Sequence, residues 1–472
     1  MDSTVKLPID FVEYTSRLLG EDEFRLLSEA IAGASPISLR LNRMKWSGND
    51  ISASSKVPWA ADGFYLDSRP TYTFDPLFHA GAYYVQEASS MFIEHILKTY
   101  VDGPVTMLDL CASPGGKSTS SVSVLPHGSV LVSNEINRQR ANVLGENMIK
   151  WGYPNVVVTN NAPADFSSFE NLFDVVLADV PCSGEGMFRK DAQSIEEWSV
   201  SNVNMCGERQ RSIIEDVWPA IKPGGLLIYS TCTYNTVEDE ENIKWIVEEL
   251  GAEVLDVPVD PEWGISGNML SESAFPVFRF FPHRTKGEGF FACVMRKCDD
   301  GSFSPRSEKK KNKDKRREKN VGRESFPAEM KSWIKDNADY KFIRNDGVVL
   351  AYPSYCADFM EGLRTKLKVV HAGIVLAASK GKNFQPCHSL AMSNVLADDA
   401  FVVAEIDYED AISYLRTESV VLDSGIPKGY VLLKYKGVPL GFVKNVGGRA
   451  NNLYPQEWRI RSGYMPENIV CL

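Results

Sequence analysis

Short apolar runs alternate with longer amphipathic stretches before about residue 300 of the chain. The runs predict strands over Val105–Leu110, Val130–Ser133, Val156–Thr159, Phe173–Ala178 and Leu226–Ser230. Between them, amphipathic patterns predict helices over Arg138–Trp151 and Cys206–Ile221, the second kinked at Pro219 and stopped by Pro223-Gly224-Gly225. Strands that alternate with helices form βαβ units with right-handed crossovers, so this pattern predicts a parallel sheet covered by helices.

The pattern changes on both sides of this region. Val277–Pro282 and Gly289–Met295 predict a hairpin that closes the edge of the sheet, and after about residue 391 short β-rich runs dominate, including Tyr430–Tyr435 and Val438–Val443. We therefore predict a chain divided into an N-terminal module (1–75), a core (76–299), a basic disordered linker (300–325), a mixed α/β domain (326–390) and a β-rich domain (391–472).

Composition narrows the class of protein. The chain has 472 residues, of which 44% are hydrophobic and 24% charged, as in an ordinary soluble protein. It has no apolar run of the ~18 residues that a membrane span needs and no signal peptide at its N-terminus, so we expect a cytoplasmic protein without a membrane partner. Nine cysteines without CxxC pairs favour reduced thiols over a disulfide framework or a structural metal site.

Charge is distributed unevenly along the chain. The net charge is −11, which by itself argues against a nucleic-acid partner, yet the segment from Arg306 to Arg323 holds ten basic and three acidic residues. Such a run cannot bury an apolar face, so we predict a disordered linker. It is either a solubilising spacer or an arm that follows phosphates, whose binding would weaken with salt.

A glycine-rich turn follows the first predicted strand, in Asp109-Leu110-Cys111-Ala112-Ser113-Pro114-Gly115-Gly116-Lys117-Ser118. Small residues let the backbone approach a ligand, with a helix N-terminus behind it. A P-loop needs a glycine six positions before its lysine, and Cys111 stands there, so nucleotide hydrolysis is disfavoured. The second strand ends at Glu135, whose carboxylate can accept hydrogen bonds from ribose hydroxyls. The glycine turn and the Glu135 carboxylate together favour a cofactor that contains adenosine but is not held by a pyrophosphate-binding loop. The alternatives are that the turn binds no ligand and that Glu135 is a solvated strand end.

Two cysteines follow predicted strands. The fourth strand runs into Asp179, Pro181 and Cys182, and the fifth into Cys232. The carboxyl ends of parallel strands meet at one edge of an open α/β sheet, where ligands bind. Two thiols at that edge indicate covalent chemistry on an electrophilic ring, with two small buried residues as the alternative.

These segments resemble the RNA cytosine-5 methyltransferases of the class I, S-adenosylmethionine-dependent type. The similar segments are Cys111–Lys117, Asp179–Gly186 with Arg189–Asp191, Ser230–Thr233, Tyr84–Met91 and Gly287–Phe291. The resemblance covers roughly residues 35–298. Beyond residue 390 the chain resembles the PUA-like RNA-binding tail of the bacterial F-type 16S rRNA methyltransferases, through Lys444–Arg449 and Asn451–Pro455. It implies a class I Rossmann-like methyltransferase core with an N-terminal α/β module and a C-terminal PUA-like β-rich domain.

The resemblance also implies a site. S-adenosyl-L-methionine would be the cofactor, ribosomal RNA or the small ribosomal subunit the partner, and no metal would take part. The implied cofactor-binding residues are Cys111, Ala112, Ser113, Pro114, Gly115, Gly116, Lys117, Glu135, Arg140, Asn161 and Asp179. The family usually has an aspartate near the adenine where this chain has Asn161, so either this amide or Asp165 would make that contact.

The implied chemistry gives the two thiols different roles. Cys232 would add to C6 of cytosine and make C5 nucleophilic, Asp179 would bind or protonate N3, and Cys182 would assist the loss of the C5 proton and the release of the enzyme. Two alternatives stay open. A non-catalytic RNA-binding assembly factor could keep a methyltransferase shell, and a DNA cytosine methyltransferase would reverse the roles of the cysteines.

Overall fold

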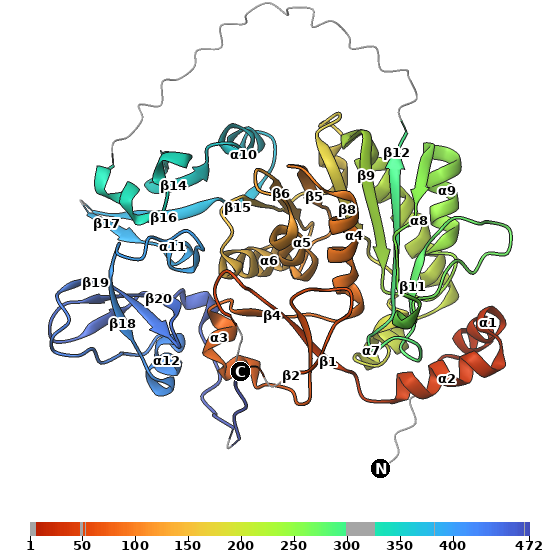
Figure 1. Cartoon of the computed structure of the whole chain (residues 1–472), viewed down its shortest axis with the longest axis horizontal. Helices are drawn as coiled ribbons and strands as arrows, with labels where there is room; N and C mark the ends of the chain where they lie inside the picture. Colours follow the sequence, from red (N-terminus) through yellow and green to blue (C-terminus); the bar gives the residue numbers. More distant parts are fainter. Residues whose placement is uncertain (1–5, 48–50, 52, 299–325, 382, 467) are drawn as a thin grey trace, which may run out of the picture.

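The computed structural model describes residues 6–47, 51, 53–298, 326–381, 383–466 and 468–472. Its centre is a nine-stranded sheet whose strands follow the order β10-β12-β9-β8-β5-β6-β7-β15, with β11 paired to β12 (Figure 1). The strands are β5 (Thr106–Asp109), β6 (Val130–Asn134), β7 (Val156–Thr159), β8 (Phe173–Asp179), β9 (Ile221–Thr231), β10 (Ala252–Leu255), β11 (Phe278–Phe280), β12 (Phe290–Lys297) and β15 (Val369–Ala372). The predicted basic linker lies outside the described residues.

Strands β5 to β9 form the predicted parallel part of the sheet. β6 and β7 lie on one side of β5, and β8 and β9 on the other, so the strand order reverses between β5 and β8. A crevice opens at the carboxyl ends of the strands at such a switch point. The antiparallel strand β12, inserted between β9 and β10, completes this side and carries the predicted hairpin with β11.

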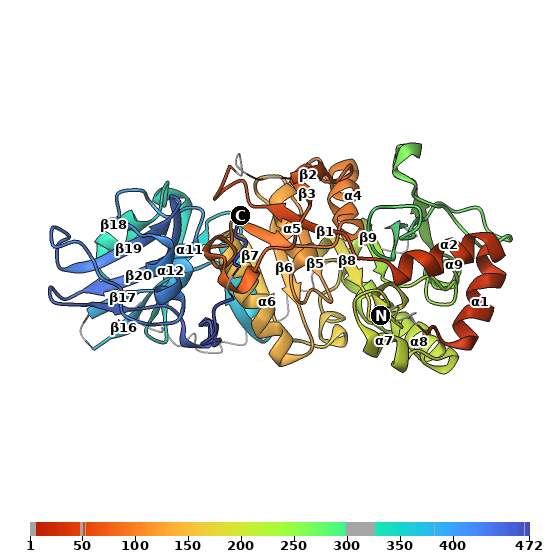
Figure 2. The ribbon, with the colours of Figure 1, turned by 90° about the horizontal axis from the view of Figure 1, so that it is seen from below.

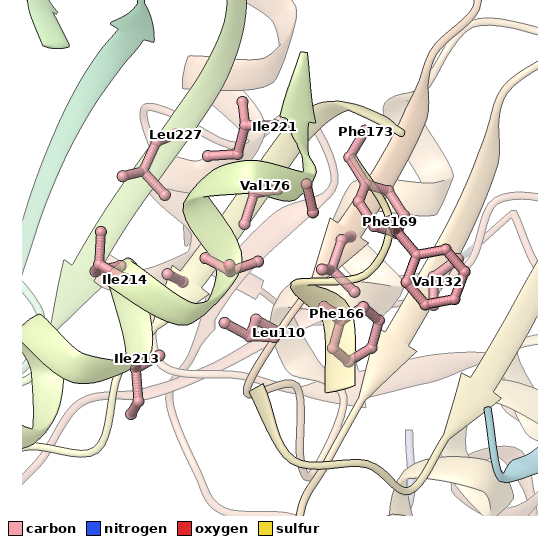
Figure 3. Packing of buried hydrophobic residues seen from close by; sticks show 14 of the residues in the cluster. Leu110, Val132, Phe166, Phe169, Phe173, Val176, Ile213, Ile214, Ile221 and Leu227 are labelled. Atoms are coloured by element: carbon pink, nitrogen blue, oxygen red, sulfur yellow. The ribbon is translucent and has the colours of Figure 1, made fainter. Parts of the chain in front are cut away.

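Alternating side chains fill a core on each face of the sheet, because successive residues of a strand point to opposite faces. Met107 belongs to one hydrophobic cluster and Leu108 to the other. Figure 3 shows the cluster of Leu108, in which Val132 lies near Phe166 and Phe169, and Ile214 comes from helix α8 (Val200–Val217). The other core helices are α4 (Phe92–Tyr100), α5 (Gly116–Val124), α6 (Arg138–Trp151), α7 (Ala192–Glu197) and α9 (Glu240–Leu250).

One predicted helix has other bounds in the structure. Helix α6 has the predicted bounds, whereas the helix expected over Cys206–Ile221 begins at Val200 and ends at Val217. Pro219 lies in a short 3-10 turn, because proline lacks the amide that would continue the helix. Strand β9 then begins at Ile221 and includes the Pro-Gly-Gly segment, so the prediction of a kink was wrong.

A small antiparallel sheet precedes the core, in the order β2-β3-β1-β4. Its elements are α1 (Ile9–Leu19), α2 (Glu21–Ala32), β1 (Ile37–Leu41), β2 (Ala53–Lys56), β3 (Gly63–Leu66), α3 (Pro76–His79) and β4 (Tyr83–Val85). This sheet shares a hydrophobic cluster with the C-terminal elements, in which Leu39 and Leu41 join Ile412 and Leu433. The N-terminal sheet and the C-terminal elements therefore pack together, whereas α1 and α2 lie apart from the C-terminus, as Figure 2 shows.

Two further four-stranded sheets follow the linker, β13-β14-β16-β17 and β18-β19-β20-β21. Their elements are β13 (Tyr340–Asn345), β14 (Val348–Pro353), α10 (Ala357–Arg364), β16 (Ile374–Lys380), β17 (Asn383–Pro386), α11 (His388–Met392), β18 (Val402–Glu405), α12 (Tyr408–Leu415), β19 (Gly429–Tyr435), β20 (Val438–Asn445) and β21 (Ala450–Asn452). The predicted boundaries near residues 75, 299 and 390 stay predictions. No helix in the described ranges has the length and apolar character needed to cross a membrane.

Candidate active site

The turn after β5 is tight and is held from the side by helix α6. Gly115 has a φ of 114°, a left-handed conformation that favours glycine, and Gly116 begins helix α5. Arg140 of α6 donates a hydrogen bond to the carbonyl oxygen of Ser113 at 2.9 Å, and the Ser113 hydroxyl donates to the Arg140 carbonyl at 3.0 Å. The glycine turn therefore has a fixed position at the switch point of the sheet.

A buried arginine of the N-terminal sheet holds the same turn from its other side. Arg40 donates to the side chain of Gln86 at 3.0 Å and to the carbonyl oxygen of Gly116 at 3.3 Å. It also donates to the hydroxyl of Thr119 and lies over the ring of Trp151. The N-terminal sheet thus forms part of the wall of the site.

A cavity of about 370 Å³ lies at the carboxyl ends of β5 and β8. Asp109 lines this cavity and is fully buried. Its Oδ2 accepts a hydrogen bond from the Ser118 hydroxyl at 2.6 Å, whereas its Oδ1 has no hydrogen-bond partner among the described residues. Burial raises the pKa of Asp109 to about 7. A buried acceptor without a partner costs free energy, so this oxygen suits a ligand that brings a donor such as an amino group. S-adenosylmethionine carries one and fits this cavity.

Lys117 and Asp179 form an ion pair in the wall of the cavity. The Lys117 Nζ donates to Asp179 Oδ2 at 2.8 Å, and the Ser230 hydroxyl donates to Asp179 Oδ1 at 2.8 Å. Burial alone would lower the pKa of Lys117, but the charge of Asp179 and its hydrogen bond, with smaller contributions from Cys232 and Asp109, raise it. The lysine is therefore charged, and it lies within electrostatic range of the Cys232 thiol.

The two cysteines predicted to act together are in contact. Their Sγ atoms are 3.2 Å apart, and the Cys232 amide lies 3.4 Å from the Cys182 Sγ. The hydrogen bond with Cys232, followed by burial, raises the pKa of Cys182 well above its ordinary value. Both thiols are partly exposed, and of the two Cys232 lines the cavity while Cys182 does not. The two thiols therefore differ in their relation to the cavity wall.

A buried carboxylate joins the loops that carry the two cysteines. Glu185, three residues after Cys182 and 1% exposed, accepts from the Thr233 hydroxyl at 2.7 Å and from the Tyr234 amide at 2.6 Å. Its other oxygen accepts from Trp198 at 2.9 Å and from Asn235 at 3.1 Å. Because Thr233 directly follows Cys232, these bonds fix one cysteine loop against the other.

The implied adenosine end of the site lies beyond the cavity, at the ends of β6 and β7. Glu135 has a side chain only 4% exposed, which accepts from the Asn137 amide at 2.8 Å and pairs with Arg140 at 3.4 Å. The Asn161 side chain is bound to protein on both sides, since its Nδ2 donates to Asp165 at 2.9 Å and its Oδ1 accepts from the Lys368 amide at 3.0 Å. Asp165 is exposed.

The structure brings most of the predicted site residues to one place. Those that line the cavity are Cys111, Ala112, Ser113, Pro114, Gly116, Lys117, Asp179 and Cys232. Those that lie behind it or beside it are Gly115, Glu135, Arg140, Asn161 and Cys182. Their roles in catalysis and cofactor binding stay predictions.

Among the polar residues that line the cavity, Asp109 and Glu288 were not predicted as site residues. Asp109 is the last residue of β5, as Asp179 is of β8, so the same reasoning could have found it. Glu288 comes from the loop before β12 and is bound by Arg189 at 3.1 Å and Lys190 at 3.4 Å. No periodic signal marks Glu288, because its partners lie about a hundred residues earlier. Within the described ranges no group of three or more histidine, cysteine, aspartate or glutamate side chains could hold a metal ion.

The strand order, the glycine turn and the cavity at the switch point define a class I S-adenosylmethionine-dependent methyltransferase. Residues 100–296 match the family described as 16S rRNA methyltransferase RsmB/F, residues 7–88 the N-terminal domain of 16S rRNA methyltransferase RsmF, and residues 401–460 the methyltransferase RsmF PUA domain. The ribosomal RNA small subunit methyltransferase F of Erwinia tasmaniensis is 30% identical over 473 residues, covering 96% of this chain and 97% of that protein. The chain therefore belongs to the ribosomal RNA small subunit methyltransferase F family.

Other relatives and solved structures agree with this fold. The ribosomal RNA small subunit methyltransferase F of Aliivibrio fischeri (strain MJ11) is 30% identical over 447 residues, covering 89% of this chain and 90% of that protein. A methyltransferase homolog protein from Pyrococcus horikoshii superposes with a TM-score of 0.51 at 26% identity, covering 62% of this chain and 100% of that one. NSun6 from the same organism, solved with SFG, gives a TM-score of 0.54 at 18% identity, over 62% of this chain and 99% of that one.

Proposed function

We propose that this protein methylates C5 of a cytosine in small-subunit ribosomal RNA through a covalent adduct between Cys232 and C6 of the base. The observation that carries the proposal is the contact of the two thiols beside the Lys117–Asp179 pair. The relatives are named for ribosomal RNA of the small subunit, and the PUA match over residues 401–460 supports RNA docking by the C-terminal domain. When bound, S-adenosylmethionine supplies an electrophilic methyl group.

Cys232 is the proposed nucleophile because it lines the cavity. C5 of cytosine is a poor nucleophile, and addition of a thiolate to C6 gives C5 the electron density that it needs to accept a methyl group. A free cysteine has a pKa of about 8.5, so the site must favour the thiolate. The charged Lys117 side chain provides a positive charge within range of Cys232. Lys117 would thus stabilise the attacking form of the thiol.

Asp179 would act on the polar edge of the base. Lys117 and Ser230 each donate to one of its oxygens, and both bonds are 2.8 Å long. These two bonds hold the carboxyl group in the cavity wall. In its protonated form it would donate a hydrogen bond or a proton to N3, which stabilises the charge that develops on the ring during attack at C6, and it would take the proton back when the bond to Cys232 breaks. Asp109 would meanwhile accept from the amino group of the cofactor.

Cys182 would complete the reaction. Its sulfur lies 3.2 Å from the sulfur that would be bonded to the base, and its raised pKa makes its thiolate a strong base once its own proton has passed to solvent. We propose that this thiolate takes up the C5 proton, that the electrons of the C5–H bond restore the C5–C6 double bond, and that the bond between C6 and Cys232 breaks with Cys232 leaving as a thiolate. The two thiols would therefore act in sequence.

The proposal is tested with the full-length protein, a small-subunit RNA transcript, assembled small subunits and S-adenosylmethionine labelled in its methyl group. We expect label in 5-methylcytidine after digestion of the RNA to nucleosides and mass spectrometry. Label at a cytosine nitrogen would overturn the C5 assignment. A protein that binds the RNA and transfers no label to any of these substrates would instead be the non-catalytic assembly factor.

Glu185→Gln is expected to lower kcat by about tenfold or more and to leave KM for S-adenosylmethionine unchanged. All four hydrogen-bond partners of Glu185 are donors, so a glutamine amide would face a donor and leave it unsatisfied, at a cost of about 1–3 kcal/mol in the free energy of unfolding. Initial rates and urea unfolding measure the two effects. Glu197→Gln, at an exposed position of α7, is the matched control and should match the wild type. An unchanged kcat in Glu185→Gln would contradict the positioning role.

A further inference from the structure

Strand β15, from the segment after the linker, forms one edge of the methyltransferase sheet. It runs antiparallel to β7, with Val369 opposite Thr159 and His371 opposite Val158. Figure 1 shows β15 between β6 of the core sheet and β14, which precedes it in sequence. Lys368 precedes β15 directly, so its backbone lies at the carboxyl end of β7. At this end the chain enters the loop of Asn160 and Asn161.

The loop is bound to Lys368 by two hydrogen bonds. The Asn160 amide donates to the Lys368 carbonyl oxygen at 2.9 Å, and the Lys368 amide donates to Asn161 Oδ1 at 3.0 Å. Asn161 is 6% exposed and uses its Nδ2 to donate to Asp165 at 2.9 Å. Both ends of its amide are thus bound to protein groups, and the side chain does not line the cavity.

The same loop is bound to the end of β6, where Glu135 lies. The Asn160 side chain donates to the carbonyl oxygens of Glu135 at 2.8 Å and Ile136 at 2.9 Å. Asn134 accepts from the Asn161 amide at 3.0 Å and donates to the Asn161 carbonyl oxygen at 2.9 Å. A change in the position of Asn161 would therefore be passed to Glu135, the residue that would meet the ribose.

We propose that Asn161 is a positioning residue for S-adenosylmethionine and that the backbone of Lys368 holds it in place. The inference rests on the cofactor edge assumed in the proposed function. It makes the segment after the linker a part of the cofactor site, although none of its residues lines the cavity. The competing explanation is a direct contact between Asn161 and adenine. Removal of the Lys368 amide should weaken cofactor binding if Asn161 is a positioning residue, and should leave it unchanged if Asn161 contacts adenine directly.

The test measures binding of S-adenosylmethionine to the full-length protein by calorimetry, without RNA. Asn161→Ala is expected to raise Kd about tenfold. Lys368→Pro removes the amide donor and the side chain outside the cavity, and it also fixes φ at this position; it should raise Kd to a similar extent. The double variant should bind no more weakly than the weaker single variant, because both remove one link. With saturating cofactor, kcat should stay within about twofold of the wild type.

Controls separate this result from loss of the fold. Asn155→Ala removes a comparable amide, which donates to the Ser129 carbonyl oxygen at 2.9 Å at the amino ends of β7 and β6, and should keep the wild-type Kd. Thermal unfolding identifies a variant that has lost its fold. If Asn161→Ala binds weakly and folded Lys368→Pro binds normally, Asn161 touches the cofactor directly and the inference is wrong. It is also wrong if both bind normally. A wild-type protein that binds the cofactor but transfers no methyl group would overturn the proposed function alone.

Discussion

Cys232→Ala is expected to lose methyl transfer by at least about a thousandfold, whereas Cys182→Ala is expected to accumulate a protein–RNA adduct that survives denaturation. The reason is the unequal position of the thiols. Cys232 lines the cavity and would bond to the base, while Cys182 does not line it and has a raised pKa. Without Cys182 the adduct would form and would not be resolved. Denaturing gel electrophoresis with labelled RNA measures the adduct, and nucleoside analysis measures the product.

The opposite outcomes separate the remaining hypotheses. An adduct in Cys232→Ala and none in Cys182→Ala would assign the attack to Cys182, as in DNA cytosine methyltransferases. Wild-type ribosome assembly by both variants would favour a non-catalytic assembly factor. Cys206→Ala is the matched control, because this thiol is buried in α8 away from the cavity and should leave the adduct and the product unchanged.

Arg279→Leu is expected to lower the free energy of unfolding by about 3–5 kcal/mol, because it leaves the buried carboxylates of Asp239 and Glu240 without their arginine partner. The Arg279 side chain is 1% exposed and forms ion pairs with Asp239 at 3.3 Å and with Glu240. It also donates to the Tyr234 carbonyl oxygen at 2.8 Å, in the segment that follows Cys232. Urea unfolding followed by circular dichroism measures the loss.

The loss in Arg279→Leu should depend on pH. Burial already raises the pKa of Asp239 well above its ordinary value, against the lowering effect of Arg279. Without the arginine this pKa rises further, and a raised pKa in the folded state destabilises the protein as pH rises. The variant should therefore lose less stability at about pH 5 than at about pH 8. Arg284→Leu removes a half-exposed ion pair with Glu23 and should cost less than about 1 kcal/mol. A pH-independent loss in Arg279→Leu would contradict this account.

The candidate site shows how far local sequence patterns reach. Asp179, Cys182 and Cys232 were predicted to meet because each follows an apolar run that had to be a parallel strand, and such strands end at the same edge. The contact between the two sulfurs and the Lys117–Asp179 hydrogen bond agree with that expectation. The bounds predicted for the helix over Cys206–Ile221 differ from those of α8 for a local reason, since amphipathic periodicity does not locate the point near Pro219 at which the helix ends.

By itself, then, the sequence determined the parallel sheet, the glycine turn and the edge at which the two thiols lie, because periodicity and strand ends are local properties of the chain. Only the tertiary structure decided that Arg40 holds the glycine turn, that Leu39 and Leu433 share a core, and that Lys368 binds Asn161. The last two residues are 207 positions apart. Contacts between such distant residues depend on how whole elements pack, and no local pattern of apolar and polar residues encodes that.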